Sequence, residues 1–367
     1  MMRAALAALI LAMVAAAMVA AGDPHRGTPL WPGARYTQED RDRAVARGLR
    51  FMFDVAHNPD TFREYGHDLL SAFYNISITS RSGALRSTAW TMGHERALAW
   101  RRLHPTVPPG ADINDFCDLV FGHDAARRLG SPDPSMQAAL ARSSTRFTVY
   151  DYLLFDPVVE PPPSDLPDEC SKCGQQNARG ATVCSRCGAR LQMRNRYDLY
   201  QDALITTYSG DRAGIKLGAH YRDVLKWAPQ MRPYPPRLPD NKDDYYGGVY
   251  SATHLIYTYN DYSQFRVSPD CFPLEYRHLE DNLRQAVAEK DPETMGEYLD
   301  TLRAFGLTLD NQLIRTGFEY LLGAQNRDGS WGDIHDPDPY GRYHPTWTAV
   351  DGLRDYGWTR VLPCPAP

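Results

Sequence analysis

The sequence predicts a mainly helical protein with one small β module inserted near its middle. Apolar residues recur with the helical period of about 3.6 residues along most of the 367-residue chain, and strand patterns outside the module are short. Two Cys-x-x-Cys pairs mark the module, and a proline-rich stretch precedes it. The helical part is therefore expected in two runs, residues 23–160 and 196–367, separated by a linker and module at residues 161–195.

Five helices are expected before the linker, after an opening segment at residues 23–36 that is rich in proline and glycine. In the first of them, Ala44, Val45, Leu49 and Met52 share one face at helical spacing. The five predicted ranges are Arg41–Val55, His67–Ile78, Leu85–Leu103, Asp115–Arg128 and Met136–Phe147.

Seven helices are expected after the module. Asp310 is placed to cap the start of one of them, because a carboxylate accepts hydrogen bonds from the free N–H groups of a first helical turn. The predicted ranges are Tyr197–Thr207, Ala213–Trp227, Gly248–Tyr262, Leu274–Ala288, Pro292–Phe305, Asn311–Gln325 and Trp347–Leu353.

The amino terminus is typical of an export signal, which we assign to residues 1–22. One basic residue, Arg3, precedes an uncharged apolar run from Ala4 to Ala21, which ends in small residues where a signal peptidase would cut. The run is near the lower limit for spanning a bilayer, so an uncleaved membrane anchor at residues 4–21 is the alternative. In either case we expect an exported protein, periplasmic or extracellular, which contacts the membrane only if this segment stays uncleaved.

The four cysteines of the module have the spacing of a tetrahedral zinc site. Cys170 and Cys173 form one pair, and Cys184 and Cys187 form the second pair after ten intervening residues. The segment resembles the zinc-ribbon family over residues 170–188. A closed site of four thiolates implies a structural rather than a catalytic zinc ion. Two disulfides or redox-active pairs are the alternatives.

Three further cysteines, Cys117, Cys271 and Cys364, leave an odd count outside the module. In an exported protein they predict either free thiols or one disulfide with one thiol left over.

The composition is that of a globular protein without a nucleic-acid partner. Hydrophobic residues make up 43% of the chain and charged residues 23%, and the net charge of −5 offers no basic surface for a phosphate backbone. The 22 tyrosines, 12 phenylalanines and 7 tryptophans suit either a cavity for an apolar or sugar-like ligand or large rings in the core.

A motif near the carboxy terminus indicates a particular helical architecture. After Arg315 the chain has a glycine, aromatic and aliphatic residues and then Gln325-x-x-x-Gly329-x-Trp331. The motif and its continuation, residues 315–353, resemble the repeat of squalene-cyclase-like and prenyltransferase-like proteins, whose fold is an α/α toroid.

That resemblance implies that the glutamine caps the end of a neighbouring helix and that the tryptophan stacks over it. A degenerate echo of the motif begins at Arg47-Gly48-Leu49. A generic helical bundle is the alternative architecture.

His344 is the first candidate for a site residue. The resemblance places it at the start of an inner helix, where protein prenyltransferases have a zinc-binding histidine, and its ring is expected in the central cavity near Asp333. The Asp-x-Cys pair of those enzymes and the Asp-x-Asp-Asp run of the cyclases are both missing around it. The resemblance therefore implies the fold and not the reaction.

Two further histidines are candidates on other helices. His254 shares a helix face with Tyr257 and Asp261, and His220 precedes Asp223 by three residues, a spacing that can orient an imidazole. Converging on one cavity, such groups make an acid/base pair or a second metal site. Ordinary packed or exposed helix positions are the alternative.

We therefore expect an exported α/α-toroid protein with a structural zinc ribbon, acting as an enzyme or enzyme-like binder. Its small or polymeric ligand would sit in a central cavity lined by His, Asp and Tyr side chains. The candidate catalytic residues are His344, His254, Asp333 and His220. The alternative is a non-catalytic envelope protein whose toroid and ribbon are docking surfaces for other proteins.

Overall fold

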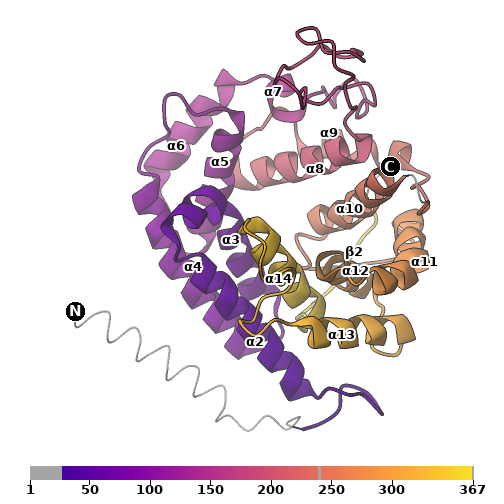
Figure 1. Ribbon diagram of the computed structural model, residues 1–367. Helices are drawn as coiled ribbons and strands as arrows, with labels where there is room; N and C mark the ends of the chain where they lie inside the picture. Colours follow the sequence, from indigo (N-terminus) through magenta and orange to yellow (C-terminus); the bar gives the residue numbers. More distant parts are fainter. Residues whose placement is uncertain (1–26, 239–240, 366–367) are drawn as a thin grey trace.

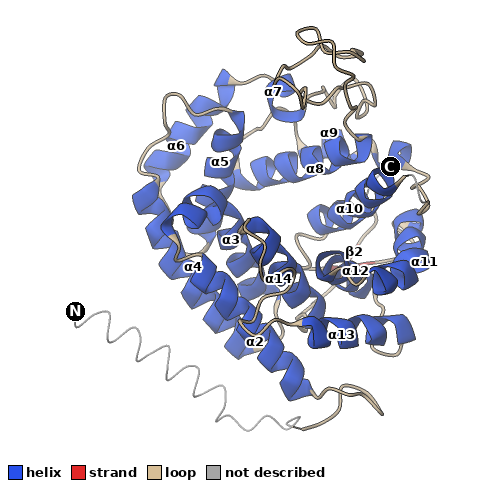
Figure 2. Ribbon diagram, viewed as in Figure 1, coloured by secondary structure: helices blue, strands red, loops and turns tan. Residues whose placement is uncertain are grey.

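The protein is mainly helical, as the sequence predicts. The computed structural model describes residues 27–238 and 241–365, and helices dominate these residues (Figure 2). The expected signal or anchor at residues 1–22 lies outside the described residues. Within the described ranges, no helix has both the length and the apolar character that a membrane span requires.

Six helices precede the inserted segment, which we define as residues 161–195, and seven follow it in the described part of the chain. Those before it are α2 (Gln38–Val55), α3 (Pro59–Thr79), α4 (Gly83–Leu103), α5 (Ile113–Arg128), α6 (Pro134–Ser143) and α7 (Val149–Leu153). Those after it are α8 (Arg196–Ala213), α9 (Tyr221–Leu225), α10 (Lys242–Tyr259), α11 (Pro273–Glu289), α12 (Pro292–Phe305), α13 (Gln312–Ala324) and α14 (Tyr340–Leu353).

Two 3-10 turns and two very short strands complete the described elements. The turns are η1 (Ser144–Arg146) and η2 (Ala228–Met231). Strands β1 (Arg266–Val267) and β2 (Val361–Leu362) pair in parallel, Arg266 with Val361 and Val267 with Leu362.

Capping residues fix where the helices begin. Thr37 and Asp40 form a reciprocal capping box at the start of α2. Asp291 caps α12 just before Pro292, whose missing N–H suits a first helical position. At α13 the cap is Asn311 and not Asp310 as predicted. The side-chain oxygen of Asn311 accepts from the N–H groups of Leu313 and Ile314, one position further along.

The predicted helix Ala213–Trp227 is wrong. Helix α8 runs on to Ala213 and ends at Gly214, whose φ of 70° is left-handed and closes the helix. A second glycine with positive φ, Gly218, keeps the next residues extended, so that only the short α9 and η2 follow. Helix α14 begins at Tyr340, seven residues before the predicted start, because the chain accommodates Pro345 inside the helix.

Six helices form a closed circuit of neighbours. Helix α3 contacts α5, α5 contacts α8, α8 contacts α10, α10 contacts α12, α12 contacts α14, and α14 returns to α3. The other long helices pack outside this circuit: α2 against α14, α4 against α3 and α5, α11 against α12, and α13 against α12 and α14. Figure 1 shows the last helix, α14, lying beside the first described helix, α2.

One hydrophobic core joins the helices on both sides of the inserted segment. Its buried residues run from Ala44 in α2 to Leu353 in α14. The inserted segment has a separate small cluster of its own, formed by Cys170, Cys184 and Leu191. The segment therefore projects from the helical body at the end nearest α7, as Figure 1 shows.

The motif that contains Gln325 and Trp331 connects α13 to α2. The two side chains make different contacts from those that the family resemblance implies. Gln325 Nε2 donates to the carbonyl of Ala44, which lies within α2 and not at its end. The helix-end role belongs to Trp331, whose Nε1 donates to the carbonyl of Leu321 in the last turn of α13 at 2.7 Å. Gly48 makes room for this fully buried indole, since a Cβ there would lie 2.8 Å from its ring.

The three cysteines outside the inserted segment form one disulfide and leave one thiol. Cys271, just before α11, is bonded to Cys364 near the end of the described chain. Cys117 in α5 is free, and burial raises the pKa of its thiol to about 12. Cys117 is therefore poorly suited to act as a nucleophile.

Candidate functional site

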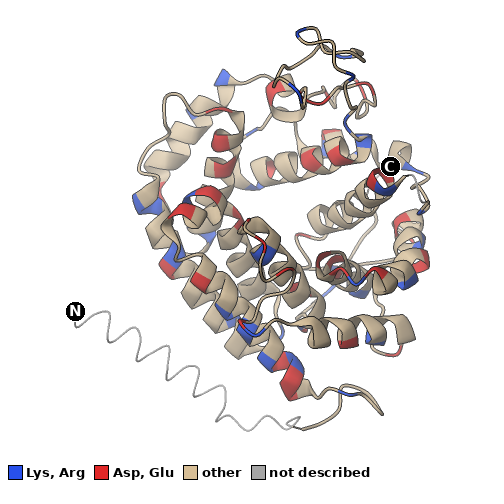
Figure 3. Ribbon diagram, in the orientation of Figure 1, with Lys and Arg blue, Asp and Glu red and all other residues tan. Residues whose placement is uncertain are grey.

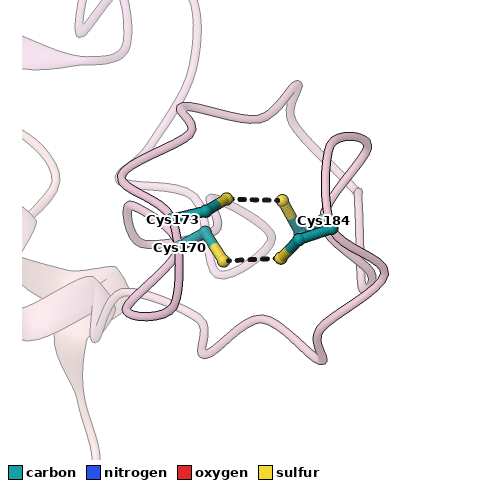
Figure 4. A group of neighbouring side chains, drawn as sticks. Cys170, Cys173 and Cys184 are labelled. Carbon is teal, nitrogen blue, oxygen red and sulfur yellow. Dashed lines mark hydrogen bonds between the residues drawn. The ribbon is translucent and has the colours of Figure 1, made fainter.

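Four cysteine sulfurs converge in the inserted segment. The Sγ atoms of Cys170 and Cys187 are 3.6 Å apart, as are those of Cys173 and Cys184, and all four lie within 4.8 Å of one another. Figure 4 shows the sulfurs of the two knuckles facing each other. A disulfide would need about 2 Å between sulfurs, so the predicted alternative of two disulfides does not describe this arrangement.

The local backbone explains why the sulfurs converge. In the first knuckle the N–H of Gly174 donates to the carbonyl of Cys170, and in the second the N–H of Gly188 donates to that of Cys184. Both glycines have positive φ, which lets the chain turn back immediately after the second cysteine of each pair.

This cysteine group could hold a metal ion. Four ligands at about 2.3 Å around one ion define a tetrahedron with edges of about 3.8 Å, close to the observed sulfur separations. In the described part of the chain, no other group of three or more His, Cys, Asp or Glu side chains is arranged to hold a metal. A second metal, which the sequence analysis left open, therefore has no ligand set among these residues.

A close contact between α12 and α14 creates the second candidate site, in the interior of the helical body. A Cβ on Gly296 would lie 2.4 Å from the carbonyl oxygen of Thr348, so only glycine fits at this crossing. The crossing sets Glu293 and Glu297 of α12, one helical turn apart, beside the first turns of α14.

His344 and Glu293 form a charged pair across this contact. The His344 Nδ1 lies 3.2 Å from Glu293 Oε1, the two side chains are 15% and 24% exposed, and the imidazole stacks on Tyr340. Burial lowers the pKa of His344, but contact with Glu293 and the charge of Asp68 outweigh it and raise the pKa to about 9. His344 is therefore an imidazolium at neutral pH.

His254 and Glu297 form a second pair, which is uncharged where the first pair is charged. Glu297 Oε2 lies 4.0 Å from His254 Nδ1 and accepts a 2.6 Å hydrogen bond from Thr253 Oγ1. The His254 ring is held by the carbonyl of Tyr250, 2.9 Å from Nδ1. Burial lowers the pKa of His254 to about 4 and raises that of Glu297 to about 8. Both partners are therefore neutral at pH 7, and Glu297 carries a proton.

Tyrosines and further carboxylates surround these pairs. Asp68 in α3 accepts a 2.9 Å hydrogen bond from the hydroxyl of Tyr343. The hydroxyl of Tyr257 donates to the backbone carbonyl of Glu297 at 3.1 Å. Burial raises the pKa of Tyr257 and Tyr262, so that their hydroxyls stay protonated and can donate hydrogen bonds.

The structure places Asp333 apart from His344. Asp333 is exposed and accepts from the backbone N–H of His335. The carboxylate that pairs with the His344 ring is that of Glu293 and not that of Asp333. Asp333 and Glu293 instead line one groove of about 490 Å³ between the start of α12, the end of α13 and the start of α14.

Basic and acidic residues are mixed over most of the helices (Figure 3).

His220 does not join the interior groups. It lies at the surface at the start of α9, with 46% of its side chain exposed, and its ring pairs with Asp211 at 2.8 Å. Asp223, the expected partner of the ring, instead accepts from the backbone N–H of His220.

Sequence reasoning missed the carboxylates of the interior. Glu293 and Glu297 are four residues apart in the predicted helix Pro292–Phe305, and this spacing places both on one helix face. That spacing was a usable signal, but nothing local distinguishes it from a solvated helix face. Only the contact with α14 brings these residues to His344.

Comparison of the chain with known protein families, with curated proteins and with solved structures finds no match.

Proposed function

We propose that this chain is an exported enzyme with an α/α-toroid fold, a structural zinc ribbon and an acid–base active site in its interior. The observation that carries the proposal is the pairing of a charged His344–Glu293 contact with a neutral His254–Glu297 contact inside one set of tyrosine-lined helices. Titratable groups whose surroundings push their pKa values apart are typical of sites that transfer protons.

The closed circuit of six helices supports the toroid. In such a fold each inner helix contacts the next, and the last contacts the first, with outer helices packed behind them. The order of contacts from α3 through α14 and back to α3 has this form. The residues of the interior site lie on α3, α10, α12 and α14, which belong to the inner circuit.

Zinc is the metal that suits the cysteine group best. Four thiolates at tetrahedral separations match the preferred ligands and geometry of zinc, and no position remains open for a substrate. The ion would hold the inserted segment together, since that segment has a core of only three buried residues. The Cys271–Cys364 disulfide supports export, because disulfides persist in oxidising compartments.

The interior site supplies protons at neutral pH. Glu297 is protonated because burial raises its pKa, and His344 is protonated because Glu293 holds the charge beside it. A buried carboxylic acid or an imidazolium can protonate a leaving group. His254 stays neutral, Thr253 donates a hydrogen bond to the Glu297 carboxyl, and Asp333 lies in the neighbouring groove beside Glu293.

A docking function is the second candidate, favoured by exposed apolar residues on and beside the inserted segment. Val158 and Val159 precede the segment and are exposed, and Val183 and Met193 within it are exposed as well. Small zinc ribbons that present such residues can serve as contact modules for another protein. In this reading the interior pairs only stabilise the fold.

Replacing His344 with asparagine tests the enzyme proposal. Turnover of chromogenic esters, amides and glycosides at pH 7 is measured for the wild-type protein and for His344→Asn. Loss of the imidazolium should lower the turnover by about 10²–10⁴-fold, with helical content and zinc stoichiometry unchanged. His220→Asn is the matched control, because His220 is exposed and its ring pairs with Asp211, and the variant should keep full activity.

Two outcomes would contradict this assignment of His344. Unchanged turnover in His344→Asn would exclude a catalytic role, and a global loss of helical structure would make His344 a packing residue. A wild-type protein that turns over nothing in the panel would favour the docking function.

A further inference from the structure

A small polar cavity is lined by Asp68, one of the carboxylates that surround the interior pairs. It has a volume of about 60 Å³ and is enclosed by α3, α5, α8, α14 and the turn after α10. His67, Asp68 and Asn75 line it from α3, Tyr262 and Trp347 from the opposite elements. A buried water needs about 10–15 Å³ of such volume and two to four polar neighbours, so the cavity suits a few water molecules.

Two polar atoms in the lining have no protein partner. Neither His67 Nδ1 nor Asn75 Oδ1 contacts a hydrogen-bonding group within the described residues, and both atoms are buried. The Asn75 side chain belongs to a residue that is only 3% exposed. Buried polar atoms are almost always hydrogen-bonded, to ordered water where the protein supplies no partner. Both atoms therefore indicate water in the cavity.

The other ring nitrogen of His67 faces a carboxylate. His67 Nε2 lies 3.4 Å from Asp118 Oδ1, which reaches it from α5. A carboxylate beside one imidazole nitrogen favours the proton on that nitrogen and leaves a lone pair on the other. His67 lines the cavity, and a lone pair on its unpartnered Nδ1 can accept a proton from water there.

We propose that His67, oriented by Asp118, is a general base that activates a water molecule in this cavity, and that the reaction is a hydrolysis. The inference rests on the proposed acid–base function of the interior. In the step, a water proton moves to His67 Nδ1 while the water oxygen bonds to the electrophilic centre of the substrate. The bond to the leaving group breaks, and His67 gives that group the proton it took from the water.

The tautomer of His67 tests this directly in the wild-type protein, without a substrate. Nitrogen-15 NMR of histidine-labelled protein should find the neutral form of the His67 ring protonated on Nε2 and bare on Nδ1. Asp118→Asn, which removes the orienting charge, should shift the ring toward the other tautomer. Asp115→Asn, an exposed carboxylate on the same helix, should leave the tautomer unchanged.

A proton on Nδ1 of the neutral ring in the wild-type protein would overturn the proposal, because that nitrogen could not accept one from water. A crystal structure with no ordered water within hydrogen-bonding distance of Nδ1 would overturn it as well.

Activity measurements distinguish the role of His67 from the acid–base function of the interior pairs. For a substrate turned over in the chromogenic panel, reaction in H₂¹⁸O should place one labelled oxygen in the product, and His67→Gln should lower turnover by about 10²-fold or more. Turnover that depends on His344 but not on His67 would refute the role of His67 and leave the acid–base function standing. A correct His67 tautomer with full activity in His344→Asn would refute the acid–base assignment instead.

Discussion

Replacing Cys184 with serine is expected to empty the metal site and unfold the inserted segment while the helical body stays folded. The segment has only a three-residue core of its own, so a metal ion held by the four cysteines would supply most of the free energy that folds it. Apparent binding free energies of structural zinc are on the order of 10–16 kcal/mol in small zinc-dependent folds, and losing one thiolate removes most of this. The helical body has a separate continuous core and should keep its melting temperature.

Three measurements check this expectation. Elemental analysis should give one zinc ion per wild-type chain and less than one in Cys184→Ser. Limited proteolysis should cut the variant within residues 164–192, and circular dichroism should show unchanged helical content. Cys117→Ser is the matched control, because Cys117 lies in α5 outside the cysteine group. Full zinc content in the Cys184 variant, or collapse of the helical body with the segment, would contradict the account.

Replacing Glu297 with glutamine is expected to abolish activity and to make the protein more stable at alkaline pH. Burial raises the pKa of Glu297 from 4.5 to about 8 in the folded state. Below pH 4.5, the ordinary pKa of a glutamate, the carboxyl is protonated in both states and its stabilising contribution is full. That contribution is lost as the pH rises through 8, because the unfolded chain ionises freely. Glutamine keeps an oxygen to accept from Thr253 and never ionises. The variant should gain on the order of 2–4 kcal/mol over the wild type near pH 9.

Thermal melts between pH 5 and 9 measure this gain, and turnover measures the accompanying loss of about 10²–10⁴-fold. Glu319→Gln, an exposed glutamate on α13, is the control and should change neither quantity. If replacing Glu297 stabilises the protein and also removes the activity, then Glu297 is retained for function and not for stability. If Glu297→Gln instead melts earlier at every pH and stays active, Glu297 is a structural residue.

The helices were predictable where local chemistry marks both ends. The range Pro292–Phe305 is confirmed, because Pro292 follows the Asp291 cap and Gly306 closes the helix with a φ of 114°. The chain after α8 was mispredicted because apolar spacing suggested one helix across residues 213–227, whereas Gly214 and Gly218 both take left-handed conformations. Periodicity alone does not reveal such breaks.

The two sites differ in how far sequence can define them. The four cysteines could be identified from spacing, because all four lie within one short segment. His344 and His254 were identified as candidates, but their partners Glu293 and Glu297 depend on the α12–α14 crossing at Gly296. The interior site is made of residues far apart in sequence, and only the packed fold brings them together.

The most direct test of the central claim is a pH titration of the individual histidines by nitrogen-15 NMR in the wild-type protein. The account predicts that His344 remains an imidazolium at pH 7.5 and loses its proton near pH 9. His254 should remain neutral at pH 5.5 and gain a proton only near pH 4. If both rings instead titrate together at about 6.5, the value of an unperturbed histidine, the interior holds no oppositely tuned pairs and the proposed acid–base site is wrong.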